Sequence, residues 1–144
     1  YGARNPQRIT KTLKIACGTA LTIMVLGCLA FTLIPGVLLS MFELSATFVE
    51  LGKTALRIIG LHYPVAAICI VLSASFQALG NGAYSTISSL CRQMVALLPA
   101  AYLLSLSGNV NMVWWSFPIA ELVSLAATLF FFTRIYRQKI KSMM

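Results

Sequence analysis

The feature that most constrains this chain is the length of its stretches without a charged side chain. No charged residue occurs between Ile15 and Phe42, and the next such stretch runs from Ile58 to Cys91. A helix needs about 20 apolar residues to cross the hydrocarbon core of a bilayer. The first stretch is long enough for one crossing, and the second is too long for one. The sequence therefore predicts a membrane protein that crosses the bilayer several times.

Composition supports lipid, rather than water, as the medium. Of the 144 residues, 59% are hydrophobic and only 10% are charged, whereas about a quarter are charged in typical soluble domains. The net charge is +8, which in a soluble protein would suggest nucleic-acid binding. Because the charges gather at the ends of the apolar segments, they indicate membrane orientation instead. We therefore expect the lipid bilayer as a partner and no nucleic acid.

Turn-forming residues divide the apolar stretches into helices. Gly80-Asn81-Gly82 splits the second stretch, and Ser107-Gly108-Asn109 is the next turn. The expected transmembrane helices cover about 8–41, 46–79, 83–106 and 111–137. Each span contains one proline, which should bend it: Pro35, Pro64, Pro99 and Pro118. The predicted fold class is all-α, a polytopic membrane helix bundle of four transmembrane helices that forms a single domain over residues 1–144.

Basic residues predict the orientation of this bundle. Four precede the first span: Arg4, Arg8, Lys11 and Lys14. Four follow the last span: Arg134, Arg137, Lys139 and Lys141. The loops on the other side carry only Lys53 and Arg57. Since cytoplasmic segments are enriched in Lys and Arg, both termini are expected in the cytoplasm, which requires an even number of spans.

Two ionisable residues are expected at membrane depth, Arg92 and Glu121. Arg92 lies ten residues after Gly82, or roughly 15 Å from the cytoplasmic side, and Glu121 lies thirteen residues before Arg134, or roughly 20 Å from it. We predict that the two side chains pair or share a polar interior. Glu121 could instead take up a proton or bind a cationic substrate. A neighbouring Arg92 favours the charged carboxylate and weakens the proton-carrier hypothesis, so a structural ion pair is preferred.

Uncharged polar residues in the spans should also face the bundle. Gln77 and Gln93 would lack hydrogen-bond partners in lipid, so we expect them to bond between helices, with substrate contact as the alternative. Ser73 and Ser75 could be satisfied by the backbone of their own helix. Together with Arg92 and Glu121, the two glutamines are the candidate residues of a substrate or ion cavity.

Other kinds of chemistry find little support. The four cysteines lie in apolar stretches without a CxxC pair, and His62 is the one histidine, so we expect no metal site. His62 could relay protons, but an interfacial histidine without a role is the preferred interpretation. There is no phosphate-binding glycine motif and no Asp. We therefore expect no enzyme activity, no catalytic residue and no cofactor.

Several segments resemble one known family in order and spacing. They are Tyr1–Arg8, with the pattern YGA-x-N-x-x-R, Ala55–Ile58, Phe76–Gly82, Leu90–Gln93 and Trp114–Glu121. This pattern resembles the bacterial multidrug and toxic compound extrusion (MATE) transporters, over nearly the whole chain. The resemblance implies a fold of twelve helices in two lobes, of which this chain would supply the last four.

The resemblance also implies an activity. Such proteins export drugs and organic cations from the cell across the bacterial inner membrane in exchange for protons or sodium ions, by rocking one lobe against the other. Small cationic or amphipathic substrates, H⁺ or Na⁺, and the missing N-terminal helices of the same transporter are the implied partners. Some branches of the family carry a coupling carboxylate on the helix that corresponds to 46–79, where this chain has no intramembrane Asp or Glu. We therefore expect a fragment that is inactive alone.

Two other hypotheses remain open from the sequence. The chain could be a complete four-helix multidrug pump that acts as a dimer, although small pumps of that kind carry their carboxylate in the first helix and Glu121 lies in the last. It could also be a membrane assembly subunit without transport activity, in which small residues and the Arg92–Glu121 pair join helices.

Overall fold

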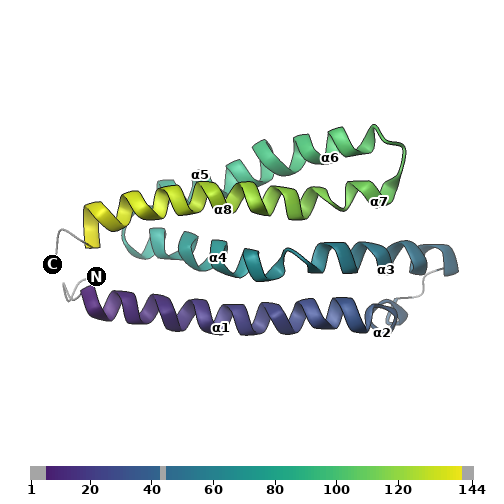
Figure 1. Ribbon diagram of the computed structural model, residues 1–144, viewed down its shortest axis with the longest axis horizontal. Coiled ribbons are helices and arrows are strands. Elements are labelled where there is room, and N and C mark those ends of the chain that lie inside the picture. Colours follow the sequence, from purple (N-terminus) through teal and green to yellow (C-terminus); the bar gives the residue numbers. More distant parts are fainter. Residues whose placement is uncertain (1–5, 43–44, 141–144) are drawn as a thin grey trace.

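The computed structural model describes residues 6–42 and 45–140, and the regular elements in these ranges are helices (Figure 1). The segment Tyr1–Asn5 of the family-like motif, with Arg4, lies outside the described residues, as do Lys141 and the side chain of Lys139. The predicted all-α fold is confirmed. Within the described ranges, three helices are long and apolar enough to cross a membrane, or four spans are present if a bent pair of helices is counted as one. The chain is a multi-pass membrane protein.

The first span is α1 (Pro6–Leu33), and a short helix, α2 (Pro35–Ser40), follows it after Ile34. Pro35 begins α2 because its ring fixes φ and it has no N–H to continue the ladder of α1. The expected helix 8–41 is therefore a span and a separate short helix. Against the backbone of α2, at Gly36, lies the side chain of Lys53 from α3.

The second span is the bent pair, α3 (Ala46–Gly60) and α4 (Tyr63–Ala78), which meet at an angle of 51°. Pro64, predicted to bend this span, stands in the first turn of α4. Since proline offers no N–H to the carbonyl four residues earlier, the break falls just before it, at Leu61 and His62. The two helices run end to end in Figure 1.

The turn after α4 is set by glycine. Gly80 has φ of 75°, in the left-handed region that favours glycine. Its N–H donates to the Gln77 carbonyl at 2.9 Å, and the Asn81 N–H donates to the Phe76 carbonyl at 2.7 Å. These two bonds satisfy carbonyls that the helix end leaves free, which closes α4 and turns the chain back.

The third span is continuous but not wholly α-helical. It comprises α5 (Gly82–Leu90), the π-helical segment η1 (Cys91–Leu97) and α6 (Leu98–Ser105). In η1 the Leu98 N–H bonds to the carbonyl of Gln93, five residues back. The wider turn comes directly before Pro99, which cannot donate to the ladder. The sequence predicted a plain helix here, so the π-helical segment is a correction.

The fourth span is also divided. A one-turn helix, α7 (Val110–Val113), precedes α8 (Ser116–Ile135), and a second π-helical segment, η2 (Tyr136–Ile140), follows it. The break at Trp114 and Trp115 was not predicted. Asn109 caps α7, since its side chain accepts a hydrogen bond from the Asn111 N–H at 3.0 Å.

The helices lie lengthwise beside one another, with the start of α1 and the end of α8 at the same end of the bundle (Figure 1). α4 is the central helix and packs against α1, α5 and α8. The apolar core near that end consists of Leu72, Phe76, Leu79 and Ile135. Most of α1 leaves its apolar side chains exposed, as expected for a helix that contacts lipid.

One glycine allows α1 and α3 to approach closely. A Cβ added at Gly60 would lie 3.2 Å from the Cβ of Phe31 and 3.7 Å from the carbonyl oxygen of Cys28. Small residues at such crossings let membrane helices pack backbone to backbone. In contrast, a Cβ added at Gly18 of α1 meets nothing within 4 Å.

We expect Gly60→Val to destabilise the bundle by about 1–3 kcal/mol, because the added methyl groups would push α1 away from α3. Gly18→Val is the matched control, and its melting temperature should stay near that of the original chain. Thermal unfolding of the purified variants in detergent measures the difference. Equal melting temperatures for the two variants would show that the crossing at Gly60 is not tight.

Candidate functional site

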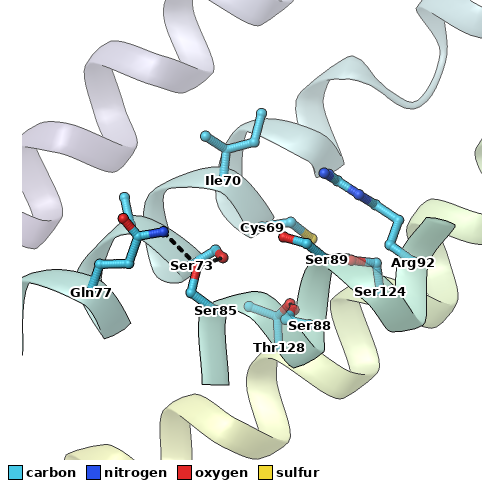
Figure 2. A pocket seen from close by; sticks show the side chains of 11 residues that line it. Cys69, Ile70, Ser73, Gln77, Ser85, Ser88, Ser89, Arg92, Ser124 and Thr128 are labelled. Carbon is cyan, nitrogen blue, oxygen red and sulfur yellow. Dashed lines mark hydrogen bonds between the residues drawn. The ribbon is translucent and has the colours of Figure 1, made fainter. Parts of the chain in front are cut away.

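Three helices each contribute a stripe of polar side chains to the centre of the bundle. The stripe on α4 consists of Cys69, Ser73 and Gln77, that on α5 and η1 of Ser85, Ser88 and Arg92, and that on α8 of Glu121, Ser124 and Thr128. Spacings of three or four residues place the members of each stripe on one face of its helix. Apart from Glu121, the side chains of these stripes line a cavity of about 240 Å³. Figure 2 shows the lining side chains directed into this shared space.

Hydrogen bonds between hydroxyl groups join the three helices. The hydroxyls of Ser73 and Ser85 lie 2.8 Å apart, and the amide nitrogen of Gln77 donates to Ser85 at 2.9 Å (Figure 2). Ser88 and Thr128, both buried, bond at 2.8 Å. The expectation for Ser73 was wrong, since its hydroxyl bonds across helices. Ser75 does bond its own helix, at the Val71 carbonyl.

The three polar stripes together form a row of side chains between the helices, which we call the polar seam. Arg92 and Glu121 meet at one end of it. A guanidinium nitrogen of Arg92 lies 3.7 Å from Oε2 of Glu121. The Glu121 side chain is only 5% exposed, whereas that of Arg92 is 33% exposed. A charge-assisted hydrogen bond would measure about 2.7–2.9 Å, so the pair is loose. Oε1 of Glu121 is buried and has no hydrogen-bond partner among the described residues. The carboxylate therefore has two weak partners, the guanidinium of Arg92 and the thiol of Cys69.

A second cavity, of about 390 Å³, is lined by both members of this pair. Arg92 lines both cavities. The other side chains that line the second cavity are mostly apolar or aromatic, and they include His62, Tyr63, Phe117 and Glu121. It is the larger of the two cavities, and Glu121 is one of its lining residues.

His62 is part of this second cavity. Its ring stacks on Phe117, with ring centres 6.1 Å apart, and lies edge-on to Tyr63 at 5.3 Å. Its Nδ1 is buried and has no hydrogen-bond partner among the described residues. The structure thus places His62, at the break between α3 and α4, on the wall of a cavity rather than on a plain interface. Whether His62 has a role at this cavity stays a prediction.

The arrangement favours a ligand that donates hydrogen bonds and carries positive charge. An unpaired carboxylate oxygen in an apolar setting is costly unless a donor reaches it. Aromatic faces nearby attract cations. A cationic amine with an apolar body would satisfy both the carboxylate and the walls of the second cavity.

The four predicted site residues do not all share one cavity. Arg92 and Glu121 come together, Gln77 lines the first cavity and Gln93, largely exposed, lines the second. The polar seam was not predicted from the sequence. It could have been found from two sets of polar residues that have matching spacing on neighbouring antiparallel helices. One set is Ser85, Ser88 and Arg92, and the other is Glu121, Ser124 and Thr128.

Comparison with known proteins gives one match. The family model MatE matches residues 1–103, a segment that runs from before α1 into α6 and includes Arg92 but not Glu121. No curated protein and no solved structure matches the chain.

We expect Arg92→Leu to destabilise the bundle more than the double change Arg92→Leu with Glu121→Leu. The single change leaves a buried carboxylate without a counter-charge, and the double change removes both charges. The single change should cost about 1–3 kcal/mol, below the loss at a fully buried pair because Arg92 is a third exposed. Chemical unfolding in detergent measures the free energy of unfolding of the original chain, of each single variant and of the double variant. If the losses from the two single changes simply add up to that of the double change, the two side chains do not interact.

Proposed function

Since the chain belongs to the MatE family of transporters, we propose that it forms part of a secondary exporter of drugs and organic cations. Export would proceed in exchange for protons or sodium ions. Such exchange needs a site that holds the substrate in one state and releases it in another. The second cavity, beside Glu121, is the site that we assign to the substrate.

The observation that carries this proposal is the unsatisfied carboxylate of Glu121. It is buried, its Oε1 lacks a partner among the described residues, and it faces a cavity of about 390 Å³ with aromatic walls. The loose contact with Arg92, at 3.7 Å, leaves the carboxylate able to attract a second cation. The guanidinium group of Arg92 then competes with the substrate for the carboxylate of Glu121.

We further propose that the chain is a single transmembrane domain that corresponds to the last four helices of a twelve-helix transporter in the cell membrane. Both its ends would lie in the cytoplasm. The excess of basic residues at the two ends supports this orientation, as does the location of the start of α1 and the end of α8 at one end of the bundle (Figure 1). On this view the other helices of the transporter complete the cavity, and the chain alone is inactive.

Binding of tetraphenylphosphonium, a cation with an apolar body, tests the site in the detergent-purified chain. We expect Glu121→Gln to weaken binding by about tenfold or more, because the neutral amide no longer balances the positive charge. We expect Arg92→Gln to strengthen it, because the competing guanidinium is gone. Calorimetry or fluorescence competition gives the dissociation constants.

The matched control is Glu50→Gln. Glu50 is exposed and bonds Lys53 at 2.7 Å, far from the cavity, so its removal changes the net charge equally and should leave binding intact. Equal weakening by both glutamate variants would mean that the cation responds to net charge alone, and the assignment of the cavity would fail.

Transport itself separates the exporter fragment from a self-sufficient pump. In proteoliposomes that contain this chain alone, we expect no drug-dependent flux of protons or sodium ions. A measurable flux would favour a dimeric four-helix pump instead. An open reading frame for eight further helices upstream of Tyr1 would independently support the fragment.

A further inference from the structure

The outward face of the end of α8 carries a second, unrelated group of side chains. Phe130, Thr133, Arg134, Arg137 and Gln138 surround a hollow of about 300 Å³. Their spacing covers two turns on one face of the helix. Phe130 is 63% exposed, and both arginines are exposed. The hollow therefore opens outward, away from the polar seam.

The opposite face of the same helix end is held in the core. Ile135 is 1% exposed, and Phe131, Phe132 and Tyr136 pack against the cluster around it. The backbone that carries Arg134 and Arg137 is thus anchored by its neighbours. Residues three apart on a helix are neighbours on its surface, with Cβ atoms about 5–6 Å apart, so both guanidinium groups can reach one anion.

Among the described residues, no carboxylate pairs with these arginines. The chain contains three acidic residues in all. Glu50 bonds Lys53, Glu121 lies beside Arg92, and Glu43 lies outside the described residues. Neither arginine makes an ion pair with a described residue. The described part of the chain therefore supplies no counter-anion to these two arginines.

We propose that this group binds the phosphate of an anionic phospholipid. Arg134 is the first charged residue after Glu121 and lies in the last turn of α8, so we place it where lipid headgroups begin. Guanidinium groups suit phosphate because their planar forks bond two oxygens at once. The exposed ring of Phe130 lies one turn deeper and would contact the glycerol and the upper acyl chain. A free phosphate ion would satisfy the arginines but would not use Phe130.

Lipid binding is measured on the full chain in detergent, with added phosphatidylglycerol and, separately, phosphatidylcholine, by native mass spectrometry. The original chain should retain phosphatidylglycerol in preference to phosphatidylcholine. Two lost cations near the membrane surface correspond to about 30-fold weaker phosphatidylglycerol binding for the double change Arg134→Gln with Arg137→Gln. Phe130→Ala should weaken lipid binding and leave both arginines in place.

The matched control is Lys11→Gln with Lys14→Gln. Both lysines are exposed on α1, near the same end of the bundle, so this change removes the same charge without touching the hollow. We expect it to weaken phosphatidylglycerol binding by less than about threefold. Equal losses for the two double variants would show diffuse attraction and overturn the site.

A last arm separates lipid from free phosphate. Inorganic phosphate at the same concentration should displace little phosphatidylglycerol and should not raise the melting temperature. If it matches the lipid in both readouts, and if Phe130→Ala has no effect, the ligand is an ion and the lipid assignment is overturned. Circular dichroism and melting in detergent confirm that each variant is folded.

Discussion

Hydrocarbon offers no partner to a polar group, and this constraint shapes the interior of the bundle. Every hydroxyl, amide or charge in a span must find its partner within its own helix or on a neighbouring one. Ser75 uses its own helix, while Ser88 and Thr128 use each other. The polar stripes of three helices consequently converge on one seam, and the seam fixes which faces of these helices meet.

The same constraint makes Glu121 unusual. Around it the hydroxyl groups pair at 2.8 Å, but its own contact with Arg92 is longer and one of its oxygens has no partner among the described residues. Oε1 of Glu121 is one of five buried side-chain polar atoms without a hydrogen-bond partner among the described residues, and it is the one that belongs to a carboxylate. This contrast is the reason for assigning it a ligand rather than a purely structural role. In contrast, Arg134 of α8 and Arg137 of η2 are exposed, and we propose that they bind lipid phosphate.

The sequence was sufficient for the large features and insufficient for the local ones. Charge-free lengths and the Gly80 turn predicted helices and their order, because hydrophobic span length and left-handed glycine are strong local signals. The effect of Pro64 was predictable as a bend. The π-helical turn at Arg92 and the break at Trp114 were not, because both depend on how neighbouring helices pack. The meeting of Arg92 with Glu121 followed from estimated depth, whereas the role of His62 required knowing that the break in the helix turns it toward Phe117.

The break between α3 and α4 has a mechanical consequence. A helix resists bending because consecutive hydrogen bonds span every turn, and here the ladder is interrupted at Leu61 and His62. This span therefore bends most easily at the break, which can act as a hinge between α3 and α4. His62 lies at the hinge with its ring stacked on Phe117. Bending at the hinge would move His62, which lines the second cavity together with Glu121. The helices would stay aligned along the polar seam.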